Sequence, residues 1–216
     1  MINLGNLMIM GDSYSTFEGL IPDGYDTYYV NGGNGNTDVD KAEQTWWMRL
    51  VADTESSLVR NSSWSGTAVC NTGWGGRDNS DPSFVKRFDA LASGGFFEKN
   101  KIDTFIIFGG TNDSWADSPL GEPKFENWTD EDLYCTLPAI GYLVSRAAEA
   151  MPNAKIVCII NTELKPEIGD CFEKTCERFG AECIRLHDID KMNGHPTIKG
   201  MGQIEQQIID FFEKNI

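Results

Sequence analysis

The chain has 216 residues, of which 40% are hydrophobic and 24% are charged, so it is long enough to form one soluble domain with a full core. Its formal net charge of −15 argues against a nucleic-acid partner and against docking on an anionic membrane surface. No apolar stretch approaches the ~20 residues that a membrane-spanning helix needs. We therefore expect a single domain over residues 1–216 without a membrane span, and the sequence leaves its oligomeric state open.

The chain enters a strand-like run within a few residues of its start, so no signal peptide is visible in the sequence. This favours a cytoplasmic location, although a trimmed secretory leader would leave the same sequence. The six cysteines form no CxxC pair and have no neighbouring histidine, so we expect neither a metal site nor a redox motif. Cys158 lies in an apolar run and is expected in the core. Whether Cys171, Cys176 and Cys183 are free thiols or form a disulfide is left open.

Strand-like and helix-like segments alternate along the chain. In chain order, we expect a strand at 4–10, a helix at 40–53, a strand at 57–61, a helix at 82–93, a strand at 103–109, a helix at 130–151, a strand at 155–161, a helix at 166–179, a strand at 182–187 and a helix at 197–214. This alternation predicts an α/β fold, in which a five-stranded parallel sheet has helices on both faces. The near-continuous apolar run TFIIF indicates burial on both sides of the sheet.

The connections that leave the strands are long, whereas those that enter them are short. The segments 14–39, 62–81 and 110–129 follow three of the expected strands and are rich in glycine, asparagine and tryptophan. They lie at the carboxyl ends of the strands, where open α/β sheets bind their ligands. We expect the functional site at this edge.

The first strand, LGNLMIM, ends directly in Gly11-Asp12-Ser13. A buried parallel strand thereby delivers a serine hydroxyl to the carboxyl edge of the sheet. Serine is a weak nucleophile by itself, so a catalytic interpretation needs a base and an oxyanion site elsewhere in the chain.

Three further residues could complete such a site. Gly66 follows the second strand, where a glycine lets a backbone N–H approach a ligand closely. Asn112 follows the third strand in Gly110-Thr111-Asn112-Asp113, and its carboxamide is suited to stabilise an oxyanion. His195 precedes Pro196 just before the last helix and is placed to act as a general base.

These four blocks, in this order from Gly11 to Pro196, resemble the SGNH hydrolases, also called the GDSL esterase/lipase family. The resemblance implies a three-layer α/β/α sandwich with flavodoxin-like strand order and no cofactor. It further implies Ser13 as nucleophile and His195 as base. The oxyanion would be bound by the Asn112 side chain and by the N–H groups of Gly66 and Ser13.

The sequence departs from the family next to the histidine. The family usually has an aspartate three residues before it, and this chain has Met192 there. Asp190 and Asp188 are the acidic candidates, of which we favour Asp190 as the residue that orients the imidazole. A backbone carbonyl could do the same less strongly, which would leave a Ser–His dyad.

Aromatic side chains in the long loops bear on the substrate. They are Trp64, Trp74, Trp115 and Trp128, with Tyr25, Tyr28 and Tyr29 in the first loop. They could stack on sugar rings, flank an acyl chain or simply anchor the loops. We favour an esterase acting on short O-acyl (acetyl) esters of small molecules or carbohydrates over a lipase or lysophospholipase, because no long apolar lid helix is evident.

Two other classes of function share the expected architecture. A flavodoxin-like FMN or phosphate binder could use Ser13, Ser15 and Thr16 to surround a phosphate, but it would leave Asn112 and His195 without a role. A non-catalytic carbohydrate-binding domain is the second alternative, since a fold does not determine an activity.

Overall fold

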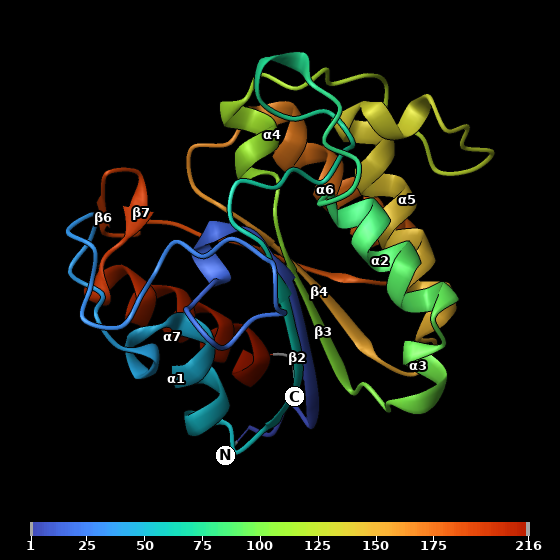
Figure 1. Ribbon diagram of the computed structural model, residues 1–216. Helices are drawn as coiled ribbons and strands as arrows, with labels where there is room; N and C mark the ends of the chain where they lie inside the picture. Colours follow the sequence, from blue (N-terminus) through green and yellow to red (C-terminus); the bar gives the residue numbers. More distant parts are fainter. Residues whose placement is uncertain (1, 215–216) are drawn as a thin grey trace.

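The computed structural model describes residues 2–214 and has a parallel sheet between two layers of helices (Figure 1). The strands are β1 (Asn6–Gly11), β2 (Ser57–Ser63), β3 (Thr104–Phe108), β4 (Lys155–Ile160) and β5 (Glu182–Arg185). They lie in the order β2-β1-β3-β4-β5 and every neighbouring pair is parallel. The predicted three-layer α/β/α sandwich with flavodoxin-like order is confirmed.

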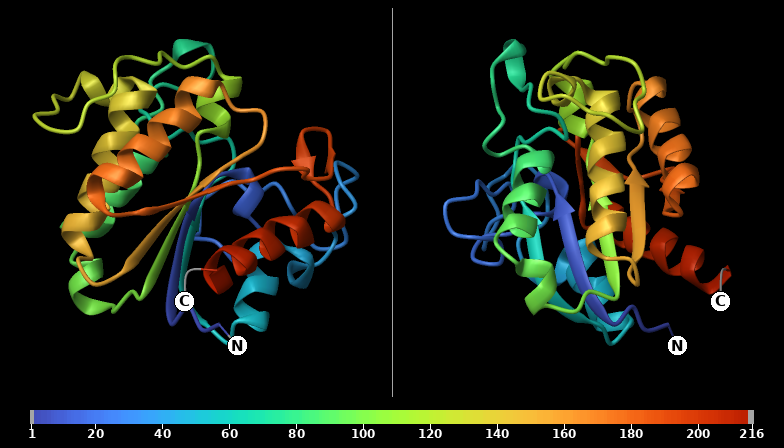
Figure 2. Two further views of the ribbon diagram at one scale, coloured as in Figure 1. Left: turned by 180° about the vertical axis from the view of Figure 1, so that it is seen from behind. Right: turned by 90° about the vertical axis from the view of Figure 1, so that its right-hand side faces the viewer.

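Both faces of the sheet are buried, because alternate side chains of each central strand point to opposite sides. In β1, Met8 and Met10 belong to one core, whereas Leu7 and Ile9 belong to the other. The first core lies under α2 (Phe84–Ser93), α5 (Thr136–Ala150) and α6 (Pro166–Phe179); the second lies under α1 (Trp46–Asp53) and α7 (Ile198–Lys214). Figures 1 and 2 show these two groups of helices on opposite faces of the sheet.

Local sequence signals explain where the helices begin and end. The α2 helix begins after Ser83, whose side chain accepts a hydrogen bond from the Lys86 N–H. The α6 helix has Pro166 in its first turn and ends just before Gly180, which adopts a left-handed conformation with φ of 69°. Its predicted bounds, 166–179, are confirmed. The helices expected at 40–53 and 130–151 are shorter, because a 3₁₀ turn precedes each: Ala42–Gln44 before α1 and Asp132–Tyr134 before α5.

Three short elements were not predicted. They are α3 (Phe96–Lys99), α4 (Thr111–Trp115) and a hairpin of β6 (Lys191–Met192) and β7 (His195–Pro196). Each is too short to show a hydrophobic period. All six cysteines are free, and Cys158 is buried in the core as expected. Within residues 2–214, no helix has the length and apolarity needed to cross a membrane.

Candidate active site

Ser13 lies directly beyond the carboxyl end of β1. The strand ends at Gly11, where a Cβ atom would lie 2.7 Å from Ser15 Oγ and 2.8 Å from Ser63 Oγ, so no larger residue fits without displacement. Asp12 then caps a 3₁₀ turn (Ser13–Ser15), since its Oδ1 accepts a hydrogen bond from the Tyr14 N–H at 3.1 Å. The Ser13 hydroxyl is thereby held by a rigid turn at the sheet edge.

The structure brings His195 to Ser13, which is 182 residues away in the sequence. Nε2 of His195 lies 2.9 Å from Ser13 Oγ, within hydrogen-bond distance. Both residues are largely buried, with exposed fractions of 8% for His195 and 4% for Ser13. This is the spacing that a nucleophile and its general base require.

The position three residues before His195 is occupied by Met192 and lies in the β6–β7 hairpin. Met192 pairs with His195 across the hairpin, and the turn between them is Asn193-Gly194. Both turn residues have positive φ, 51° and 77°, as a two-residue type I′ turn requires. The Asn193 carbonyl oxygen then lies 3.2 Å from Nδ1 of His195.

The structure does not place the two candidate aspartates against the imidazole. The Asp190 carboxylate accepts a hydrogen bond from Thr197 Oγ1 and lies 3.9 Å from Lys199 Nζ. Asp188 is exposed and lies 3.0 Å from Nδ1 of His187. In this structure Nδ1 of His195 contacts a backbone carbonyl, which is the alternative that the sequence left open, and Asp190, the favoured candidate, does not contact the imidazole.

Asn112 lies in the first turn of α4, beside the loop that follows β2. The helix begins after Gly110, whose φ of 89° lets the chain turn sharply out of β3. Nδ2 of Asn112 donates to the Thr67 carbonyl oxygen at 3.0 Å. A carboxamide carries two N–H groups, so this bond fixes its orientation and leaves one N–H for a ligand. Gly66, adjacent to Thr67, is exposed and has a φ of 76°.

Two buried charged residues that the sequence did not single out hold this loop in place. Asp113 accepts hydrogen bonds from the backbone N–H groups of Val69 and Cys70, at 2.8 and 3.1 Å. Arg87 of α2 donates to the Gly11 carbonyl at 3.2 Å and to Thr67 Oγ1 at 3.1 Å. They join the ends of β1, β2 and β3. A lone arginine on the apolar face of the expected helix at 82–93 was the available signal for this role.

The electrostatics of the site favour a neutral imidazole at neutral pH. Burial lowers the pKa of His195 below its ordinary 6.5, the Asn193 carbonyl opposes this, and the positive charge of Lys191 lowers the pKa further. A neutral imidazole can accept a proton from Ser13. Burial also raises the pKa of the neighbouring Asp12 to about 7.

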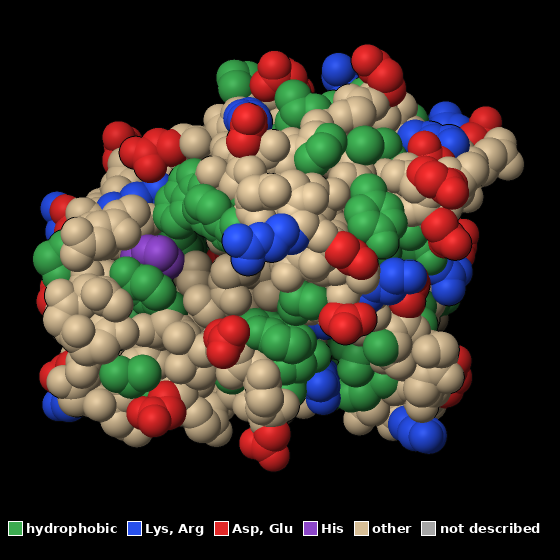
Figure 3. Space-filling view, turned by 45° about the horizontal axis from the view of Figure 1, so that its top comes forward, with side chains coloured by type: hydrophobic (Ala, Val, Ile, Leu, Met, Phe, Trp, Pro, Cys, Tyr) green, Lys and Arg blue, Asp and Glu red, His purple; other side chains and the backbone are tan. Residues whose placement is uncertain are grey.

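The loop aromatics divide into distinct groups. The Trp115 ring is inclined to His195 by 70°, with ring centroids 5.7 Å apart, and Tyr25 stacks on Trp64 at 4.1 Å. Trp128 packs against the core under α2, α5 and α6, so it anchors its loop. Trp74 is 52% exposed. Figure 3 looks onto the end of the molecule where the strands terminate and shows a histidine flanked by hydrophobic side chains.

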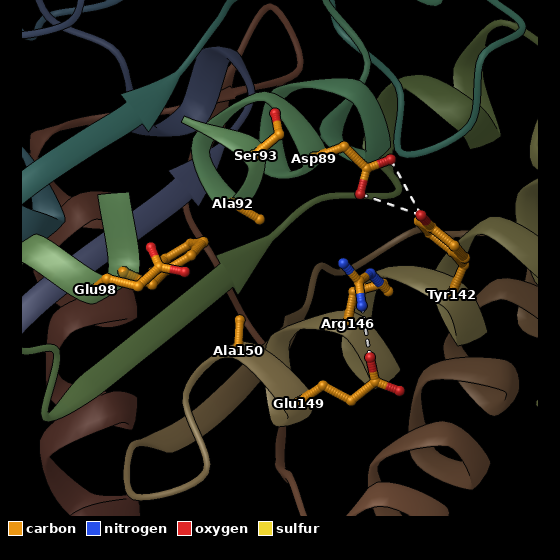
Figure 4. Close-up of a pocket in the computed structure, with 9 residues that line it drawn as sticks. Asp89, Ala92, Ser93, Glu98, Tyr142, Arg146, Glu149 and Ala150 are labelled. Atoms are coloured by element: carbon orange, nitrogen blue, oxygen red, sulfur yellow. Dashed lines mark hydrogen bonds and ion pairs between the residues drawn. The ribbon is translucent and has the colours of Figure 1, made fainter. Parts of the chain in front are cut away.

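A cavity lies away from this site, and none of its lining residues belongs to the Ser13–His195 pair. It has a volume of about 530 Å³ and is lined by residues of α2, α3 and α5, including Asp89, Tyr142 and Arg146 (Figure 4). Its polar groups bond to one another: the Tyr142 hydroxyl contacts both carboxylate oxygens of Asp89 at 3.1 Å, and Arg146 pairs with Glu149 at 2.6 Å. These polar groups bind one another and none of them belongs to the Ser13–His195 pair. The position of this cavity therefore does not indicate where the catalytic residues lie.

Among the solved structures similar to this chain are two GDSL-like lipases of known sequence identity to it. A candidate GDSL-like lipase from Bacteroides ovatus is 42% identical, with a TM-score of 0.90 and coverage of 97% of this chain and 99% of the other. A candidate GDSL-like lipase from Bacteroides uniformis is 40% identical, with a TM-score of 0.89 and coverage of 97% and 96%.

A more distant likeness shows the fold alone. A family two carbohydrate esterase from Clostridium thermocellum, solved with cellohexaose, is 15% identical, with a TM-score of 0.64 over 100% of this chain and 65% of the other. A search of curated proteins gave no match. The family model for GDSL-like lipase/acylhydrolase matches residues 5–212. The chain therefore belongs to the GDSL-like lipase/acylhydrolase family.

Proposed function

We propose that this protein is a serine esterase that hydrolyses carboxylic esters through an acyl-enzyme. The observation that carries the proposal is the 2.9 Å contact between Ser13 Oγ and His195 Nε2 at the carboxyl edge of the sheet. A serine next to a neutral imidazole in an α/β sheet is an activated nucleophile. Neither a flavin nor a phosphate binder would need this pair.

The proposed reaction has two halves. His195 accepts the proton of Ser13 as the hydroxyl oxygen attacks the ester carbonyl carbon. The Asn112 N–H that Thr67 does not engage binds the resulting oxyanion, with the backbone N–H groups of Gly66 and Ser13. The imidazolium then protonates the leaving alcohol, and a water molecule, deprotonated by His195, releases the acid from Ser13.

For the substrate, we propose short-chain O-acyl esters, acetyl esters included, carried by a small molecule or a carbohydrate. The stacked Tyr25 and Trp64 and the exposed Trp74 and Trp115 supply aromatic surface of the kind that packs on sugar rings. The fold shared with carbohydrate esterases, one of them solved with cellohexaose, is consistent with this substrate class. A lipase-type acylhydrolase is the competing proposal, since the family includes both.

Labelling with a fluorophosphonate tests the nucleophile directly. The wild-type protein should be labelled at Ser13, and Ser13→Ala should lose both the label and nearly all hydrolysis of p-nitrophenyl acetate while melting at an unchanged temperature. Ser114→Ala, a serine of α4, is the matched control and should keep both. A labelled Ser13→Ala protein would refute the assignment. A panel of acetylated sugars and p-nitrophenyl esters of increasing chain length then separates the two substrate classes.

A further inference from the structure

Three tyrosines from the segment after β1 converge on His195. Tyr14 and Tyr29 are buried, and Tyr28 is half-buried. Their ring centroids lie 5.2, 6.5 and 3.5 Å from that of the imidazole, for Tyr14, Tyr29 and Tyr28 respectively. Figures 1 and 2 show the blue segment that carries them beside the β6–β7 hairpin.

Two of these tyrosines hold the backbone on either side of the histidine. The Tyr14 hydroxyl donates to the Gly194 carbonyl oxygen, and the Tyr29 hydroxyl donates to the Pro196 carbonyl oxygen at 3.1 Å. His195 is therefore fixed by hydrogen bonds to the residues before and after it. The hairpin cannot shift without breaking one of them.

The third tyrosine acts on the ring itself. Tyr28 and His195 are nearly parallel, with an interplanar angle of 7° at the 3.5 Å centroid distance. A centroid distance this close to the thickness of an aromatic ring leaves little lateral offset. Two neutral aromatic rings disfavour such a face-to-face sandwich, because their quadrupoles repel. A cation over a tyrosine face is attracted instead, so this geometry suits the imidazolium better than the neutral imidazole.

We propose that Tyr28 is a positioning residue for the esterase reaction, which stabilises the His195 imidazolium of the transition state in a structure where no carboxylate contacts the ring. The inference rests on the proposed function, since only a base that takes the Ser13 proton becomes an imidazolium during turnover. Tyr14 and Tyr29 fix the hairpin, the Asn193 carbonyl orients Nδ1, and Tyr28 supplies the attraction to positive charge.

The other groups around the imidazole are placed differently. The rings of Trp115, Tyr14 and Tyr29 are inclined to the imidazole by 70°, 51° and 77°, so none of them lies flat against it. Lys191 is positively charged, and its charge lowers the pKa of His195. The Asn193 carbonyl is a dipole at one nitrogen. Of these groups, the Tyr28 face alone lies flat against the imidazole.

Substitution of Tyr28 tests the proposal. Tyr28→Leu keeps an apolar cover without a π face, and Tyr28→Phe keeps the face without the hydroxyl. We expect Tyr28→Leu to lower kcat by about 3- to 30-fold with a smaller change in KM, and Tyr28→Phe to stay within about 2-fold of wild type. Tyr134→Leu, the same change at an exposed tyrosine far from His195, is the control and should leave kcat unchanged.

A second readout does not depend on activity. The chain has two histidines, so His187→Gln leaves His195 as the single imidazole for an NMR titration. In this background, Tyr28→Leu should lower the pKa of His195 and Tyr28→Phe should restore it. A pKa that is unchanged or higher in Tyr28→Leu would overturn the proposal, as would a loss confined to KM. Tyr28→Met serves in the same way if the leucine variant does not fold.

The two proposals fail separately. If the wild-type protein shows no Ser13-dependent hydrolysis or labelling, the proposed function is wrong, and the NMR titration alone decides whether Tyr28 stabilises the protonated His195. If hydrolysis depends on Ser13 but Tyr28→Leu keeps both full kcat and an unchanged His195 pKa, the esterase proposal stands and the role of Tyr28 is refuted.

Discussion

Nδ1 of His195 faces the carbonyl oxygen of Asn193 at 3.2 Å. With the imidazole proton on Nδ1, this contact fixes the tautomer whose Nε2 lone pair points at Ser13. A carbonyl orients the ring as a carboxylate would, but it carries a dipole instead of a full negative charge. It therefore stabilises the imidazolium less, and the site must rely on other groups for the difference.

The first prediction concerns Asp190. Because its carboxylate lies against Thr197 and Lys199, Asp190→Asn should retain esterase turnover within about 3-fold of wild type. In serine proteases, loss of the triad aspartate that orients the histidine costs about 10⁴-fold in kcat. Steady-state kinetics of the variant therefore distinguish the two arrangements. A loss of more than 100-fold with a normal melting temperature would mean that Asp190 reaches the imidazole during turnover.

Local patterns were sufficient to predict the sheet and the blocks that carry the site. The strands β1, β3 and β4 are short apolar runs, and Ser13, Gly66, Asn112 and His195 each follow from an adjacent motif. The partner of Nδ1 was not predictable in this way. The Asn193-Gly194 dipeptide is a hairpin signal, but its two strands have two residues each and show no alternation.

The tyrosine contacts around His195 were missed for a different reason. Tyr29 and Pro196 are 167 residues apart, and Tyr14 and Gly194 are 180 apart. Such contacts depend on the packing of the first loop against the last hairpin, and no periodicity within either segment indicates that packing. The aromatic residues of that loop were visible, but whether each one faces substrate, core or His195 requires the tertiary structure.

The second prediction concerns Asn112. If its remaining N–H binds the oxyanion, Asn112→Ala should lower kcat by about 10²–10³-fold and change KM little. Asn100→Ala is a matched control, because the Asn100 side chain also donates to a backbone carbonyl, that of Phe96 at 2.8 Å, before β3 begins. The control should keep its kcat. If the Asn112→Ala loss were wholly in KM, the residue would position the ester instead of its oxyanion.

The third prediction is the pH dependence of kcat/KM. His195 must be neutral to act as a base, so activity should fall as acid protonates it. Burial and Lys191 lower its pKa, so the acid limb should lie below the ordinary value of 6.5. Lys191→Gln removes a repulsive positive charge, which should move the limb toward higher pH. Lys199→Gln, beside Asp190, is the control and should leave the acid limb at the same pH. If the acid limb lies at the same pH in the wild type and in Lys191→Gln, the charge of Lys191 does not lower the pKa of His195.

The last prediction concerns stability far from the site, where α7 packs on α1. Glu205 is buried there beside Asp53, and burial together with that carboxylate raises its pKa from 4.5 to about 7. A raised folded-state pKa means that folding takes up a proton between these values. This contribution to the free energy of unfolding is fully present below about pH 4.5 and is lost as the pH rises through 7. At pH 8 the folded protein must hold an unfavourable buried charge, which Glu205→Gln removes.

The free energy of unfolding of the Glu205→Gln variant should exceed that of the wild type by on the order of 1 kcal/mol at pH 8, or about 2–4 °C in Tm, and by little at pH 5. Glu213→Gln, at an exposed position of the same helix, should show no such pH-dependent gain. Thermal melts of both variants at the two pH values measure the difference, and an equal gain for Glu205→Gln at both would mean that it arises from packing and not from the charge.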